Sequence, residues 1–141
     1  MKVTFIGHGL KGSKETVGDY ICSSLKDDSY DSFTVFSAFT RMSGINIFKK
    51  ELLKAKETYP DIKFYLGIVE RGTSKEALDF LLENNIDTWI FCTNSSIMFH
   101  PKIYFFKGKN KARFITRSSN LTKPSLISNI EASTLLELAL V

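Results

Sequence analysis

The chain has 141 residues, of which 43% are hydrophobic and 13% aromatic. This length and composition suit one domain with a single substantial core, and they exclude a disordered chain. The 19 lysines and arginines outnumber the 15 acidic residues, so the formal net charge is +4. A moderate positive charge favours a polyanionic partner such as nucleic acid, without the charge density of a histone-like binder.

Neither export nor membrane insertion is indicated by the sequence. The short apolar run at the start is broken by Gly7, His8 and Gly9, which makes it too weak for a signal peptide. No apolar run approaches the roughly 20 residues that span a bilayer. Cys22 and Cys92 sit among apolar neighbours, as buried free thiols do. These features predict a cytoplasmic protein without membrane contact.

The first 85 residues alternate between strand and helix patterns. Apolar runs predict strands, and apolar residues at helical spacing predict helices, in the chain order 2–6, 17–25, 33–36, 48–59, 62–69 and 73–85. Pro60 ends the second helix, and Thr73 to Glu76 has the form of a capping box for the third. Such alternation is typical of an α/β domain with a largely parallel sheet.

The second part of the chain follows a different pattern. Strand-like runs at 88–92, 101–106 and 112–116 are separated by short polar turns, and residues 130–136 form a further strand. The predicted fold class is therefore α/β, with a mixed, largely parallel sheet flanked by helices. The apolar stretch 135–141 ends without a polar tail, so we expect residues 1–141 to be the N-terminal part of a larger protein.

The helix predicted at 48–59 has a polar face that carries Lys49, Lys50, Lys54 and Lys56. Such a face is most simply a solvated surface, and a contact with the DNA backbone is the alternative.

Polar residues gather at the ends of three predicted strands. His100 and Lys102 lie two positions apart where a strand begins, so their side chains project from the same face of the sheet. Alone, this pair also fits a rim histidine beside a solvated lysine. The segment Arg117-Ser118-Ser119-Asn120 follows a strand as a polar loop, and Glu131 opens the last strand.

In order and spacing, these residues resemble the half-site of the phospholipase D superfamily. That half-site reads His-x-Lys, then Gly-Ser-x-Asn, and then an acidic residue; Asn120 and Glu131 stand eleven positions apart here, as in the family. The resemblance implies one phospholipase D-like catalytic domain over residues 1–141. It points to the branch that contains small bacterial nucleases and metal-independent restriction endonucleases.

Two positions depart from the family pattern. Lys107 stands where the longer form of the motif has aspartate, which argues against a lipid substrate because the nuclease branch does not strictly require that residue. Arg117 replaces the usual glycine. Its guanidinium either clamps a phosphate or is a bulky replacement that alters the loop, and both interpretations stay open.

The resemblance implies a catalytic role for each matched residue. His100 attacks phosphorus and forms a phosphohistidine, while Glu131 holds the other ring nitrogen, unless it is only a surface carboxylate at a strand end. Lys102 and Asn120 donate to the non-bridging oxygens in place of a metal. Ser118 is a further phosphate contact, or else a loop hydrogen bonder.

Other kinds of site do not fit the residues present. Two histidines and two distant cysteines offer no zinc spacing, and no carboxylate cluster resembles a two-metal nuclease. No metal and no cofactor are therefore expected.

A single half-site lacks the acid that protonates the leaving oxygen. Family members with one motif pair two chains across a two-fold axis, which implies a homodimer in which the partner subunit supplies the acid. His8 is the only other histidine, and its glycine-rich surroundings suit an ordinary loop.

The expected function is thus a metal-independent DNA endonuclease. No base-reading module is found in the sequence, so we expect target recognition, or a helicase motor, in another part of the parent chain. The alternatives are a catalytically weak or inactive phosphate-binding and dimerisation module, or a lipid phosphodiesterase.

Overall fold

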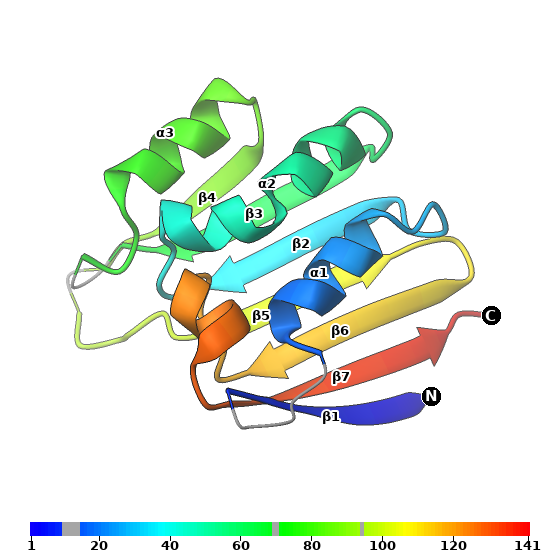
Figure 1. Cartoon of the computed structure of the whole chain (residues 1–141). Coiled ribbons are helices and arrows are strands. Elements are labelled where there is room, and N and C mark those ends of the chain that lie inside the picture. The colour runs from blue at the N-terminus through cyan, green and yellow to red at the C-terminus, as the bar shows by residue number, and fades with distance from the viewer. Residues whose placement is uncertain (10–14, 69–70, 94) are drawn as a thin grey trace.

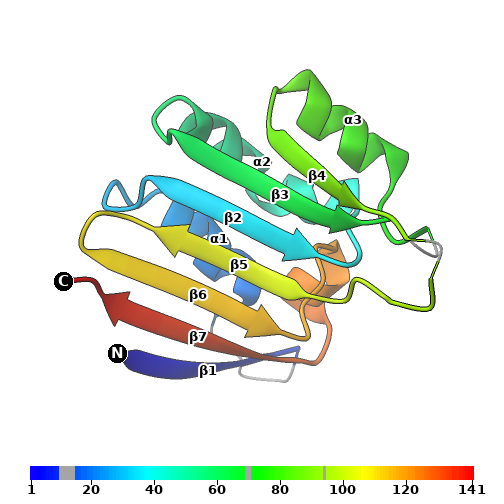
Figure 2. The same ribbon diagram turned by 180° about the vertical axis from the view of Figure 1, so that it is seen from behind.

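A computed structural model describes residues 1–9, 15–68, 71–93 and 95–141. The elements follow in the order β1 (Lys2–His8), α1 (Val17–Leu25), β2 (Ser32–Ser37), α2 (Met42–Lys56), β3 (Asp61–Gly67), α3 (Lys75–Glu83), β4 (Asp87–Phe91), β5 (Lys102–Lys107), β6 (Lys111–Arg117), the short π-helix η2 (Pro124–Ser128) and β7 (Glu131–Ala139). The helices cover one face of the sheet (Figure 1). Seen from behind, the strands lie in front and the helices lie beyond them (Figure 2).

In the described residues, seven strands form one sheet in the order β1-β7-β6-β5-β2-β3-β4. The predicted mixed α/β sheet with flanking helices is confirmed. Its parallel part is smaller than predicted, because only β2 with β3 and β3 with β4 pair in parallel, while β1 with β7, β7 with β6, β6 with β5 and β5 with β2 are antiparallel. The reason is that β1 and β2, although joined through α1, are separated in the sheet by β7, β6 and β5.

The core lies between the sheet and the helices. Phe33 of β2 is fully buried and packs against three other rings: it stacks on Phe106 of β5, and it meets Phe48 of α2 and Phe64 of β3 edge to face. Burying a side chain of this size contributes about 1.5–3 kcal/mol. This cluster therefore holds both halves of the chain together.

The helix expected at 48–59 begins earlier, at Met42. Its first turn packs on the loop after β6: Arg41 donates its backbone N–H to the carbonyl of Leu121. At Gly44 a Cβ atom would lie 2.4 Å from that same carbonyl oxygen, so only glycine allows this approach. The start of α2 is thus set by a distant contact that the local pattern does not contain.

Two local predictions need correction. The N-cap of α3 is Ser74, whose hydroxyl accepts a hydrogen bond from the N–H of Ala77, while the Thr73 hydroxyl donates to the Gly67 carbonyl at the end of β3. Both cysteines are free, but Cys22 is only half-buried and Cys92 is exposed. Cys92 directly follows the edge strand β4, where the sheet has no further neighbour to cover it.

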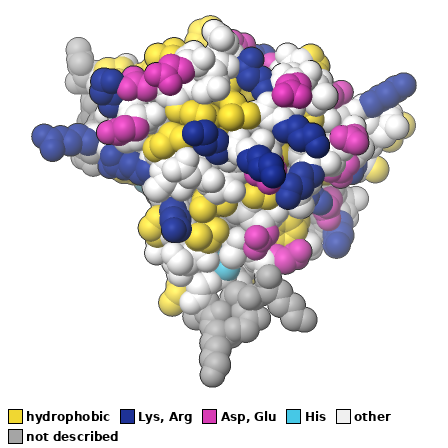
Figure 3. All heavy atoms as spheres, turned by 45° about the horizontal axis from the view of Figure 1, so that its top comes forward, with side chains coloured by type: hydrophobic (Ala, Val, Ile, Leu, Met, Phe, Trp, Pro, Cys, Tyr) yellow, Lys and Arg dark blue, Asp and Glu magenta, His cyan; other side chains and the backbone are white. Residues whose placement is uncertain are grey.

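The surface of α2 favours the solvated interpretation of its lysines. Lys49, Lys50 and Lys54 are exposed, and the ammonium group of Lys49 lies over the Phe80 ring. On the face that Figure 3 shows, lysine and arginine side chains are interspersed with aspartate and glutamate and form no single basic patch. Within the described residues, no helix is long and apolar enough to cross a membrane.

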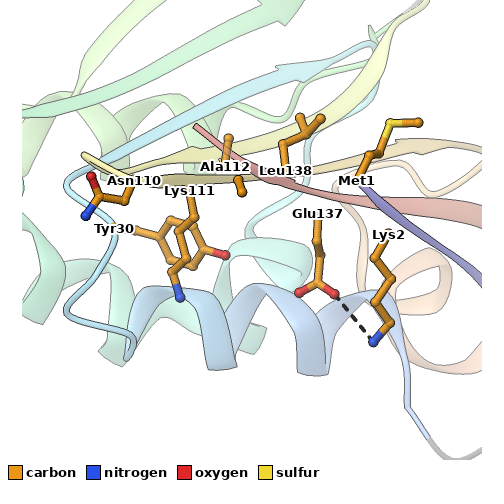
Figure 4. A pocket seen from close by; sticks show the side chains of 9 residues that line it. Met1, Lys2, Tyr30, Asn110, Lys111, Ala112, Glu137 and Leu138 are labelled. Carbon is orange, nitrogen blue, oxygen red and sulfur yellow. Dashed lines mark ion pairs between the residues drawn. The ribbon is translucent and has the colours of Figure 1, made fainter. Parts of the chain in front are cut away.

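A pocket lies where β1 and β6 begin and β7 ends, and its lining includes the ion pair of Lys2 and Glu137 (Figure 4). Glu137 accepts a hydrogen bond of 2.6 Å from the Arg113 guanidinium, which also donates to the Ser24 hydroxyl of α1. Lys2 lies 3.7 Å from the same carboxylate. This group joins β1, β6, β7 and α1, so we interpret it as structural.

We expect Glu137→Gln to lower the free energy of unfolding by about 1–2 kcal/mol at pH 7, because the variant loses a charged, partly buried hydrogen bond. The Arg113 hydrogen bond holds the pKa of Glu137 below its usual value. A lowered pKa stabilises the fold above the ordinary pKa of about 4.3 and stops doing so as the pH falls. Denaturant unfolding at pH 7 and pH 3 checks this: the difference between the two proteins should shrink at pH 3, and a constant difference would contradict the ion pair.

Candidate active site

The predicted site residues meet at one edge of the sheet. In the register of the strands, Ser37 at the end of β2 is opposite Lys102 at the start of β5. At the same edge, Arg117 at the end of β6 is opposite Ser133 of β7, and His8 at the end of β1 is opposite Glu131 at the start of β7. Residues that are far apart in the sequence therefore lie together at the same ends of these strands.

His100 is exposed and stands two residues before Lys102, the first residue of β5. Its place is set by the next residue, since the Pro101 carbonyl accepts a hydrogen bond of 3.0 Å from the N–H of Ala38 after β2. The imidazole and the Phe39 ring meet edge to face, with 6.4 Å between the ring centres. His100 thus lies beside Phe39 and remains exposed to solvent.

Lys102 lies against the imidazole, as the two-residue spacing predicts. Its Nζ is 3.0 Å from Nδ1 and 3.3 Å from Nε2 of His100. Burial lowers the pKa of Lys102, and the nearby Glu131 carboxylate acts in the opposite direction. A partly desolvated ammonium group beside an exposed imidazole is well suited to bind a phosphate oxygen.

Glu131 is half-buried at the start of β7. Its Oε1 lies 3.5 Å from the amide nitrogen of Asn129, a weak hydrogen bond. Among the described residues, no hydrogen bond joins Glu131 to His100, whose two ring nitrogens lie 3.0 and 3.3 Å from the Lys102 ammonium group. The predicted Glu131 contact with the imidazole is therefore not formed in this structure.

The loop after β6 is tied firmly to β7. The Ser118 hydroxyl accepts from the Ala132 N–H at 3.0 Å and donates to the Ala132 carbonyl at 3.2 Å. Ser119 bonds Ser133 through their hydroxyls, and the buried Tyr104 hydroxyl donates to the Ser119 carbonyl at 2.9 Å. Because the one hydroxyl hydrogen of Ser118 is used within the loop, the loop-bonding interpretation of this residue is favoured over phosphate binding.

These ties place Asn120 at the same edge of the sheet. Asn120 is half-buried, and its Oδ1 is buried without a hydrogen-bond partner. This amide oxygen can accept a hydrogen bond from a ligand, but it cannot donate one to a phosphate oxygen. The backbone of Arg117 ends β6 beside this loop, while its side chain lies outside what the structure describes.

His8 is the site residue that sequence reasoning placed wrongly. It is not in a loop but is the last residue of β1, fully buried and opposite Glu131. A signal for this position was present in the alternation of strand residues, because Ile6 and His8 are two apart and both point inward. Within the described ranges, no cluster of three histidine, cysteine or acidic side chains is placed to hold a metal ion.

Solved structures of known proteins share this fold. A phospholipase D family member, Nuc from Salmonella typhimurium, superposes with a TM-score of 0.64 at 21% identity, over 95% of this chain and 81% of that one. NucT from Helicobacter pylori gives 0.56 at 14% identity, over 96% and 84%. Polyphosphate kinase from Porphyromonas gingivalis gives 0.64 at 11% identity, over 98% of this chain but 23% of the kinase. No family model and no curated protein matches the sequence.

The strand order of the sheet, together with these solved structures, defines the fold class of the chain. The chain has the phospholipase D-like fold that the His-x-Lys resemblance implied, and that prediction is confirmed.

Proposed function

We propose that this protein is a metal-independent phosphodiesterase, an endonuclease that cleaves DNA through a phosphohistidine at His100. The observation that carries the proposal is the contact between His100 and Lys102 at the edge of a phospholipase D-like sheet. The Nuc structure, described as a phospholipase D family member, supports phosphodiester chemistry on this fold. Assays on duplex DNA and on phosphatidylcholine vesicles test the substrate class, with cleavage expected for DNA alone.

The proposed reaction has two displacements. A nitrogen of the neutral His100 ring attacks phosphorus, a P–N bond forms, and the P–O bond to the leaving nucleoside breaks. The partner's His100, protonated, gives the leaving oxygen its proton. In the second step a water molecule attacks phosphorus, the P–N bond breaks, and the partner's His100 takes the water proton.

The other proposed site residues stabilise the charge on the phosphate or on His100. Lys102, next to the imidazole, is placed to donate to the non-bridging oxygens. We propose that the Asn120 side chain donates to the same oxygens through its Nδ2 group. Glu131 lies near enough to act on the pKa of Lys102, and we propose that it turns to His100 when the ring becomes cationic. Arg117 is proposed as a further phosphate contact.

A homodimer with a shared site is part of the same proposal. Three large apolar side chains next to the catalytic residues are open to solvent: Ile97 is 66% exposed, Met98 52% and Ile130 72%. Ile97 and Met98 shortly precede His100, and Ile130 directly precedes Glu131. Exposed apolar groups around a site are typical of an interaction surface, and a second copy of the chain would bring a second His100 to the phosphate.

We expect excess EDTA to leave the rate of DNA cleavage unchanged, because Lys102 and Asn120 supply the stabilisation that a metal gives elsewhere. The measurement compares initial rates after dialysis with and without chelator. A strict requirement for added magnesium would contradict the proposal.

One observation favours a second candidate, a phosphate-binding and dimerisation module with weak or no activity. Glu131, which would orient the nucleophile, does not contact it in this structure. If DNA binds but neither DNA nor lipid is cleaved, this candidate replaces the nuclease. For the nuclease itself we propose a cytoplasmic location and a recognition or helicase region elsewhere in the parent chain.

A further inference from the structure

His8 is the buried polar side chain that the proposed reaction leaves without a role. Its exposed fraction is 0%, and neither Nδ1 nor Nε2 has a hydrogen-bond partner among the residues that the structure describes. A neutral imidazole carries one donor and one acceptor, and burying both unpaired is unfavourable. A histidine buried in this way needs a hydrogen-bond partner that the described residues do not provide in their present arrangement.

Glu131 is the acceptor in the right place. In the antiparallel pair of β1 and β7, His8 and Glu131 are directly opposite, and such partners point to the same face with Cβ atoms about 4.5–5.5 Å apart. Among the described residues, the carboxylate has one weak hydrogen-bond partner, the Asn129 side-chain amide at 3.5 Å. A rotation of the two side chains is therefore enough to join them.

The backbone holds this pair rigidly. Gly9, directly after His8, has a φ of +84°, and a Cβ atom there would lie 2.2 Å from the Asn129 carbonyl oxygen. Only glycine lets the chain cross so close to Asn129 and Ile130. The end of β1 is thus locked against the residues that lead into Glu131.

We propose that His8 is a positioning residue that donates a hydrogen bond to one oxygen of the Glu131 carboxylate. This hydrogen bond orients the other carboxylate oxygen toward His100. This inference rests on the proposed function, because it gives Glu131 the orienting role in that reaction. The complete burial of His8 keeps it from a leaving oxygen on the substrate, so it acts through Glu131 and not as the acid. The Glu131 carboxylate is thus shared between the buried His8 and His100, the proposed nucleophile.

The test uses the fact that the chain contains two histidines, so each NMR signal is assigned by removing the other residue. His8→Phe removes the donor and keeps an aromatic ring. We expect it to lower kcat about 10- to 100-fold with little change in KM, as losses of orienting partners do. The pKa of His100 should fall in His8→Phe as it does in Glu131→Gln, because in both the carboxylate no longer favours the imidazolium.

The double variant decides whether the two residues act as a unit. His8→Phe with Glu131→Gln should have the same kcat and the same His100 pKa as Glu131→Gln alone, since the effects of a coupled pair do not add. Either His8→Asn or His8→Gln, whose amide groups can donate, should restore part of kcat. Ile6→Val, on the same face of β1 but opposite Ser133, is the matched control for looser packing and should leave the His100 titration unchanged.

Two results overturn the inference: an unchanged His100 pKa in a folded His8→Phe protein, or effects of the two substitutions that simply add. If thermal unfolding shows that His8→Phe is not folded, the same comparison is made with His8→Gln and His8→Asn. The titration is independent of cleavage. A protein that cleaves no DNA but shows the coupled shift therefore overturns the proposed function and supports the pairing of His8 with Glu131.

Discussion

Replacement of His100 by alanine is expected to lower DNA cleavage by at least about 10³-fold, because in the proposed reaction this residue is both the nucleophile and the shared acid. Folding should be unaffected, since the side chain is exposed and, among the described residues, meets the Phe39 ring and the Lys102 ammonium group. The free energy of unfolding should change by less than about 0.5 kcal/mol, as for an ordinary surface substitution. Single-turnover cleavage, denaturant unfolding and DNA binding measure the three quantities.

A matched control for this variant is Lys109→Ala, which removes an exposed side chain in the turn between β5 and β6, away from the His100 edge. It should cleave DNA at the normal rate. Activity above a few per cent in His100→Ala would show that another group attacks phosphorus. Loss of DNA binding together with activity would instead assign His100 to binding.

Much of the fold follows from patterns within short stretches of sequence. The buried residues of α2 include Phe48, Leu52 and Ala55, at the helical spacing that predicted this helix, and β2 buries Phe33 and Val35 in strict alternation. Such patterns report which side of an element faces the core. They do not report which strand lies beside which, so the place of β1 next to β7 and the small parallel part of the sheet were not predictable from them.

The candidate site shows the same division. The spacing of His100 and Lys102 predicted their contact because a strand fixes the relation of positions two apart. The pairing of His8 with Glu131 depends on a strand order that joins the two ends of the chain. A short motif contains no information on that order, so His8 was interpreted as a loop residue although it is buried beside the motif.

A single mutant subunit should inactivate a mixed dimer, because each proposed site uses one His100 as nucleophile and the other as acid. We expect heterodimers of wild type with His100→Ala to be inactive and excess mutant to suppress wild-type cleavage. The phosphorus must lie between the two imidazoles, which brings their reactive nitrogens within roughly 6 Å, about two hydrogen-bond lengths. Differently tagged chains, mixed, purified as heterodimers and assayed on DNA, give the measurement.

The surface beside the site provides the control for assembly. Ile130→Glu places a charge on an apolar side chain that is 72% exposed next to Glu131, and it should yield monomers without activity. Leu82→Glu makes the same change at a leucine that is 65% exposed on α3, and it should leave assembly and activity intact. Heterodimers that keep about half of the wild-type rate would mean that each chain holds a complete site. An active Ile130→Glu monomer would lead to the same conclusion, and the acid would then have to come from a residue of the same chain other than the buried His8.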